Sequence, residues 1–91
     1  MSIEFDPAKS ERNVRERGLP FDLAEAFDFE TALIWQDCRK PYPETRWIAL
    51  GLIADRLHAL VFSETPTGIR VISLRKANSR EQARYEQKTQ S

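Results

Sequence analysis

The sequence predicts an α+β domain in which two N-terminal helices pack on an antiparallel sheet and a short helix closes the chain. Three observations support this class. Two proline-marked helix starts occur in the N-terminal third. Four segments from residue 31 onward have the alternating or continuous apolar pattern of strands. A polar segment with helix-capping residues follows the last of these strands.

The two N-terminal helices are predicted from their first residues. Asp6 can accept N–H bonds as an N-cap, and Pro7 already has a helical φ. The first helix is expected to end near Arg17, because Gly18 can adopt the left-handed conformation that closes a helix. The second is expected to begin at Pro20-Phe21-Asp22 with a capping box to the glutamate three residues later, and to last about two turns.

Four main strands and one short edge strand are predicted. The edge strand covers residues 3–5. The main strands are Thr31–Gln36, Arg46–Ala54, Leu57–Ser63 and Gly68–Arg75. The short links between the last three predict an antiparallel meander. Residues 37–45, with two prolines and several charges, are expected to form an exposed loop.

The C-terminal helix is predicted over residues 79–87. Asn78 with Glu81 and Ser79 with Gln82 both have the capping-box spacing, so either pair can start it. Most of its residues are polar. A helix of this kind either lies over the edge of the sheet or binds a partner.

Composition limits the classes of protein to consider. The 91 residues form one domain, residues 1–91, and the single cysteine, Cys38, and single histidine, His58, provide neither an internal disulfide nor a plausible zinc set. We therefore expect a cytoplasmic protein without a metal or cofactor. The longest mostly apolar stretch, Trp47–Ala54, is far shorter than the roughly 20 residues of a membrane helix, so no membrane association is expected.

The formal net charge of zero conceals an asymmetry along the chain. Residues 1–45 hold six basic and ten acidic side chains, whereas residues 46–91 hold eight basic and four acidic ones. Residues 70–88 alone hold six cations and two acids. A net charge of zero therefore does not exclude a nucleic-acid partner. The uneven distribution of charge predicts that such a partner binds the C-terminal half.

Arg75 and Arg80 are the strongest candidates for chemistry. Arg75 ends a predicted strand and Arg80 lies in the first turn of the next helix, so the two guanidiniums can approach each other. Together with a helix N-terminus they suit a phosphate. The alternative is that both are ordinary solvated arginines. Arg80 opposes the helix dipole at a cost of about 0.3–1 kcal/mol, which favours a functional role.

The remaining candidates each have two interpretations. Arg46 is either a third phosphate ligand or a strand-end charge paired with Glu44. Glu64 is either a turn residue or a general base. His58 is expected at the surface of a strand rather than in a catalytic role. Tyr85 is either an anchor for its helix or a platform on which a base stacks.

Four sequence blocks resemble the BrnT-type ribonuclease toxins of bacterial type II toxin–antitoxin modules. The last block is the most specific. The blocks are Phe5-Asp6-Pro7-Ala8-Lys9 with Asn13 and Gly18, Phe21 with Ala26-Phe27, Arg46-Trp47-Ile48-Ala49-Leu50-Gly51, and Ile69–Ala77 continued by Arg80-Glu81 and Tyr85. Many relatives carry Lys-His where this chain has Glu16-Arg17, and often His in place of Ser63, so no mechanism in this chain can require either histidine.

The resemblance implies a RelE-like fold and metal-independent cleavage of RNA that inhibits growth. It also implies neutralisation by a ribbon-helix-helix antitoxin, and contact with operator DNA only through that antitoxin. The residues expected in catalysis are Arg46, Glu64, Arg75 and Arg80. Those expected to bind RNA are Arg70, Lys76, Arg84, Tyr85 and Lys9. The alternatives are a non-catalytic partner-binding component of a repressor complex and a plain nucleic-acid-binding module.

Overall fold

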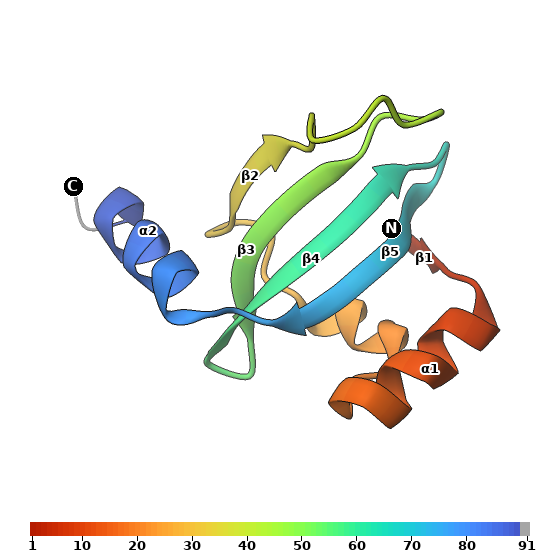
Figure 1. Ribbon diagram of the computed structural model, residues 1–91, viewed down its shortest axis with the longest axis horizontal. Helices are drawn as coiled ribbons and strands as arrows, with labels where there is room; N and C mark the ends of the chain where they lie inside the picture. Colours follow the sequence, from red (N-terminus) through yellow and green to blue (C-terminus); the bar gives the residue numbers. More distant parts are fainter. Residues whose placement is uncertain (90–91) are drawn as a thin grey trace.

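The computed structural model describes residues 1–89 and has the predicted α+β class. Its five strands form one sheet in the order β1-β5-β4-β3-β2 (Figure 1). The elements are β1 (Ser2–Glu4), α1 (Pro7–Arg17), the 3-10 helix η1 (Phe21–Ala26), β2 (Leu33–Gln36), β3 (Trp47–Ile53), β4 (Arg56–Glu64), β5 (Gly68–Lys76) and α2 (Ser79–Thr89). The domain predicted over residues 1–91 also includes residues 90–91, which lie outside the described residues.

The predicted meander is confirmed, but the sheet is mixed rather than purely antiparallel. The pairs β2–β3, β3–β4 and β4–β5 are antiparallel, whereas β1 pairs parallel with β5. A parallel pair needs a long crossover connection, and the elements from α1 to β4 provide it. Gly68 permits the pairing, because a Cβ at this position would collide with the backbone of Ser2.

The second predicted helix is instead a six-residue 3-10 helix, η1. Pro20 occupies the N-cap position without a side-chain cap bond, so the expected capping box does not form. The Phe21 N–H donates to the Ser10 Oγ of α1 at 2.9 Å, and Phe27 is already extended. The segment between these two fixed ends is short, and the tighter 3-10 geometry is typical of short helical segments.

Helix α1 has the predicted caps and attaches to the sheet through polar contacts. Asp6 accepts a hydrogen bond from the Ala8 N–H at 2.9 Å, and Gly18 is left-handed with φ 71°. The buried residues of α1 are Ser10 and Asn13. The Asn13 Nδ2 donates to the carbonyls of Leu19 at 2.7 Å and Leu74 at 2.9 Å. These bonds explain how a helix with so little apolar surface docks against β5.

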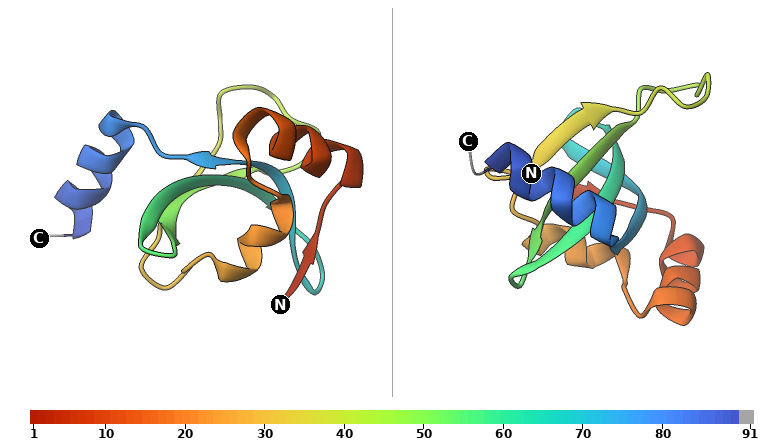
Figure 2. Two further views of the ribbon diagram at one scale, coloured as in Figure 1. Left: turned by 90° about the horizontal axis from the view of Figure 1, so that it is seen from below. Right: turned by 60° about the vertical axis from the view of Figure 1, so that its left-hand side comes forward.

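The main core lies between one face of the sheet and η1. It buries Leu60, Phe62 and Leu74 against Phe21 and Phe27. In the left view of Figure 2, η1 lies under the curved sheet, with α1 and α2 at opposite ends of the molecule. Among residues 1–89, no helix has both the length and the apolar composition needed to span a bilayer.

Helix α2 docks on the other face through a smaller apolar cluster. This cluster joins Leu50, Leu57 and Ala59 to Tyr85 and Ala77. The Asn78–Glu81 capping box forms with both bonds, at 2.8 and 3.0 Å, and so starts the helix. None of the described residues of α2 is buried. The described helices therefore leave the remainder of this sheet face uncovered.

Candidate functional site

An open groove of about 430 Å³ crosses the sheet face opposite η1. Strands β2 to β5, the β2–β3 loop and the first turn of α2 all contribute to it. Its lining residues are Trp35, Asp37, Arg39, Tyr42, Arg46, Ile48, Ala59, Val61, Ile72, Ser73, Arg75 and Glu81. Three of these side chains are arginines, so the groove is suited to an anion.

Arg75 lies at the α2 end of the groove and forms a bidentate ion pair with Glu81. Its Nη1 and Nη2 donate to the two carboxylate oxygens at 2.7 and 2.9 Å. The hydrogen bonds with Glu81 raise the pKa of Arg75, while its burial and the charge of Arg39 oppose this rise. The Arg75 side chain is still 39% exposed. Glu81 fixes its orientation, and the guanidinium keeps further N–H donors for a ligand.

Glu81 also belongs to the helix cap, because its carboxylate accepts the Asn78 N–H at 3.0 Å. The hydrogen bonds from Arg75 lower the pKa of Glu81, with smaller contributions from the Asn78 N–H and the charges of Arg75 and Arg80. Its carboxylate is therefore ionised at neutral pH. It orients Arg75 and is a weak proton acceptor.

A second bidentate pair joins Asp37 and Arg39 in the β2–β3 loop. The Asp37 carboxylate accepts from the Arg39 Nε at 2.8 Å and Nη2 at 2.7 Å. These bonds lower the pKa of Asp37 from its usual 3.8 to about 2, although burial opposes the shift. The Asp37 side chain is 0% exposed and that of Arg39 is 68% exposed. The buried carboxylate thus holds a solvent-facing guanidinium at the groove.

Arg46 precedes β3 and faces the groove together with Ile48, as the strand pattern predicts. Its Nε donates to Glu44 at 2.6 Å, so the contact of the ion-pair interpretation is present, and its role toward a phosphate stays a prediction. Its guanidinium also lies 4.1 Å from the centre of the Tyr42 ring, a cation–π contact. The side chain of Arg46 is therefore held on two sides at the loop end of the groove.

The structure brings Arg46 and Arg75 into one groove but does not bring Glu64 there. Side chains alternate along β4, so Ala59 and Val61 face the groove and Glu64 faces the opposite side of the sheet. There it lines a separate apolar hollow with Phe62. Arg80 is exposed in the first turn of α2, and its charge acts on Glu81.

The residues predicted to bind RNA do not line the groove, and they lie on different parts of the molecule. Arg70 pairs with Ser63 of β4, and alternation along β4 puts both on the groove face of the sheet. The Arg70 Nη1 lies 4.0 Å from the Glu4 Oε2. Lys76 follows Arg75 and points to the opposite face. Lys9 lies on α1, where it lines a separate pocket.

Arg84 and Tyr85 both help to fix α2. Arg84 stacks over the ring of Trp35 at 4.1 Å from its centre. Tyr85 is half-buried, and its hydroxyl donates to the Thr31 carbonyl at 3.1 Å. The anchoring interpretation of Tyr85 therefore has a contact to support it.

The contributions of Asp37, Arg39 and Tyr42 do not follow from the sequence pattern, because the prolines and charges of residues 37–45 indicate only an exposed loop. Trp35 could have been found from its alternation with Leu33 in the same strand. The surface position predicted for His58 is wrong. The residue is 4% exposed, and its Nδ1 lies 2.8 Å from the Arg56 carbonyl.

The Asp37–Arg39 pair predicts a pH-dependent stability. We expect Asp37→Asn to lower the free energy of unfolding at pH 7 by about 1 kcal/mol, less than the pKa shift alone implies because water screens the exposed Arg39. Since folding lowers the pKa of Asp37 from 3.8 to about 2, the contribution is complete above the unfolded value and disappears as the pH falls toward the folded one. Urea unfolding of both proteins from pH 7 to pH 2 measures this difference. A difference that stays constant over the range contradicts the assignment.

Comparison with protein families identifies the chain. A family model described as the ribonuclease toxin, BrnT, of type II toxin–antitoxin systems matches residues 5–81. Searches of curated proteins and of solved structures gave no match. Within residues 1–89, no three His, Cys, Asp or Glu residues are grouped in a way that could hold a metal ion. The matched segment runs from the end of β1 to Glu81 and includes every arginine of the groove. The chain therefore belongs to the family of BrnT ribonuclease toxins of type II toxin–antitoxin systems.

Proposed function

We propose that this protein is a growth-inhibiting toxin that cleaves RNA in the groove. The observation that carries this proposal is the convergence of Arg39, Arg46 and Arg75 on one open sheet face. An RNA phosphate gains negative charge as it is attacked, and preorganised guanidiniums stabilise that charge better than water does. Family membership supports ribonuclease activity, and the groove offers a place for it.

The reaction that suits such a site is transfer of the phosphodiester within the RNA strand. The 2′-oxygen forms a bond to the adjacent phosphorus and gives its proton to water, while the bond from phosphorus to the 5′-oxygen breaks. That oxygen takes a proton from water. The products are a 2′,3′-cyclic phosphate and a 5′-hydroxyl. We assign Arg75 and Arg46 to the phosphate oxygens, and alignment of the 2′-oxygen supplies a further share of the acceleration.

Electrostatic stabilisation, rather than proton abstraction, is proposed as the main catalytic effect. Each of the two carboxylates lining the groove, Asp37 and Glu81, is paired with an arginine and has a lowered pKa. A carboxylate of this kind is a poor general base near neutral pH. Glu64 faces away from Arg75, so we assign it no step. Arg80, in the first turn of α2, stays a predicted further ligand of the phosphate.

The proposal includes the partners that the resemblance implies. In the cytoplasm a ribbon-helix-helix antitoxin binds and neutralises the toxin, and operator DNA is contacted only through the antitoxin. Cleavage is proposed to need no metal ion.

A cleavage assay tests the proposed activity. The purified protein is incubated with 5′-labelled single-stranded RNA in the presence of EDTA, and the 3′ ends of the products are analysed. We expect 2′,3′-cyclic phosphate ends, and no cleavage of the same RNA carrying 2′-O-methyl groups. If the protein binds its antitoxin but cleaves neither this RNA nor ribosome-bound mRNA, the chain is a non-catalytic partner-binding component and the proposal fails.

A further inference from the structure

We propose that the RNA backbone continues from the groove across β5 to a second phosphate-binding site, between α1 and β5. This inference rests on the proposed function and extends it by assigning a path to the flanking nucleotides. The second site is a pocket of about 210 Å³. Lys9, Arg12 and Arg17 contribute its cations, and Glu16 contributes an acid.

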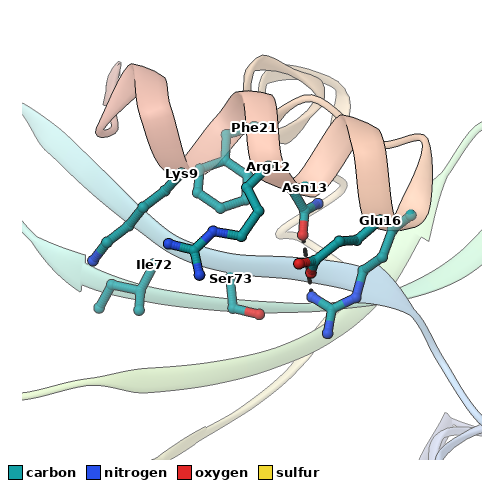
Figure 3. A pocket seen from close by; sticks show the side chains of 8 residues that line it. Lys9, Arg12, Asn13, Glu16, Phe21, Ile72 and Ser73 are labelled. Atoms are coloured by element: carbon teal, nitrogen blue, oxygen red, sulfur yellow. Dashed lines mark hydrogen bonds between the residues drawn. The ribbon is translucent and has the colours of Figure 1, made fainter.

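Lys9 and Arg12 are the groups available to bind a phosphate in this pocket. Figure 3 shows both side chains extending from α1 toward β5, with Ser73 below the Arg12 guanidinium. They are three positions apart, which makes them neighbours on one face of the helix. Within residues 1–89 neither forms an ion pair, whereas each arginine of the groove is paired with an acid. The pocket therefore has cationic charge that no ion pair among these residues neutralises.

Arg17 and Asn13 have a different part in this pocket. The Arg17 Nη1 donates to the Asn13 Oδ1 at 3.1 Å, and the Asn13 amide donates to two carbonyls. Both side chains are thus held by the fold. They form the wall of the pocket and leave the ligand to Lys9 and Arg12.

The pocket is continuous with the groove over β5. Ile72 and Ser73 line both of them. The register of β4 and β5 shifts at this point, because Val61 pairs with Ser73 and Phe62 with Val71, so Ile72 is the extra residue of a bulge. In addition, β1 pairs only with Gly68 to Arg70, so no strand of the described chain covers the edge of β5 beside the pocket. A backbone can therefore cross from one site to the other without meeting a strand.

This continuity favours RNA over an acidic peptide as the occupant. Successive phosphates of a single strand place regular negative charges along one path, and cations at both ends of the bulge match that path. An acidic segment of a partner protein would satisfy Lys9 and Arg12 without any need for the link to the groove. The two occupants give different results in the experiment that follows.

The test measures affinity for a non-cleavable RNA. Binding of a 2′-O-methyl oligonucleotide of about ten nucleotides is titrated over a range of salt concentrations with the intact protein, with Arg12→Gln and with the double variant Lys9→Gln/Arg12→Gln. We expect the double variant to raise Kd at least tenfold and to reduce the slope of log Kd against log salt, by about 0.7 for each phosphate that it no longer binds. Arg15→Gln is the matched control, since it removes one charge from α1 at an exposed position outside the pocket.

Substrate length provides a second measurement. The cleavage rate of the double variant is compared on a dinucleotide and on an RNA long enough to reach the pocket. If the pocket binds flanking phosphates, the double variant loses much more of its cleavage rate on the longer RNA than on the dinucleotide. Equal losses on both substrates, or a change in Kd no larger than that of Arg15→Gln, overturn the inference while cleavage by the intact protein still supports the proposed function. Weakened antitoxin binding with unchanged RNA binding also overturns it and assigns the pocket to a protein partner. If the intact protein does not cleave RNA, the proposed function itself fails.

Discussion

Replacing Arg75 by Ala is expected to lower the rate of RNA cleavage by about 10²–10³-fold, the usual cost of removing one preorganised donor from a transition state. Induced expression of the variant should no longer arrest growth. The expected cause is loss of a guanidinium that Glu81 holds in place through two hydrogen bonds. Single-turnover cleavage of a labelled RNA at saturating protein concentration measures the effect on the chemical step.

The control for this prediction separates a catalytic role of Arg75 from its contact with α2. Glu81→Gln removes the charge that pairs with Arg75, but its amide oxygen can still accept the Asn78 N–H and preserve the capping box. We expect Glu81→Gln to lower the rate far less than Arg75→Ala, with similar thermal unfolding in both variants. Equal losses of rate in the two variants contradict a direct contact between Arg75 and the phosphate, and assign the arginine to the docking of α2.

Arg80→Ala tests the second of the two guanidiniums, Arg75 and Arg80, that the sequence predicts at the phosphate. Because Arg80 is exposed, the fold should tolerate its loss. A loss of cleavage as large as that of Arg75→Ala supports a clamp of both guanidiniums. Retained cleavage with unchanged melting refutes the role of Arg80. The phosphate is then bound by Arg75 together with Arg39 and Arg46.

Most of the fold could be predicted because its signals are local. The caps at Asp6 and Asn78 are short-range hydrogen bonds that residue type and spacing reveal. Apolar alternation likewise identifies the meander. The direction of β1 could not be predicted in this way, because three residues carry no turn that fixes their orientation. It depends on where the crossover returns the chain, and on the close approach of Ser2 to Gly68.

The candidate site could be predicted only where its residues belong to regular strands. Alternation within each strand puts Arg46 on the face of Ile48 and Arg75 on the face of Ser73. That these are the same face of the sheet follows only from the strand register, which has a bulge at Ile72. Arg39 depends instead on a buried carboxylate in an irregular loop, and nothing in the spacing of prolines and charges indicates that contact. Alternation along β4 would also have placed Glu64 away from the groove, but only after the strand was known to continue through this residue.

Asn13→Ala is expected to lower the free energy of unfolding by about 2–4 kcal/mol. The residue is buried, and its amide supplies hydrogen bonds to the carbonyls of both Leu19 and Leu74. Without it, two buried acceptors lose their donor, at about 1–3 kcal/mol for each group left unsatisfied. A domain of this size has a total stability of about 5–15 kcal/mol, so this one side chain accounts for a large share. Urea unfolding monitored through tryptophan fluorescence measures the change.

Two further variants check that the expected loss of stability comes from the missing amide donor of Asn13. Asn13→Asp keeps the shape and the oxygen that Arg17 contacts, but it replaces the donating amide with a carboxylate facing two carbonyls. It should therefore destabilise the protein at least as much as the alanine. Val14→Ala changes the neighbouring exposed side chain and should cost less than about 0.5 kcal/mol, as most surface substitutions do. A loss below about 1 kcal/mol for Asn13→Ala would mean that water replaces the amide at both carbonyls, and that other contacts, such as the bond from the Phe21 N–H to the Ser10 Oγ, hold α1.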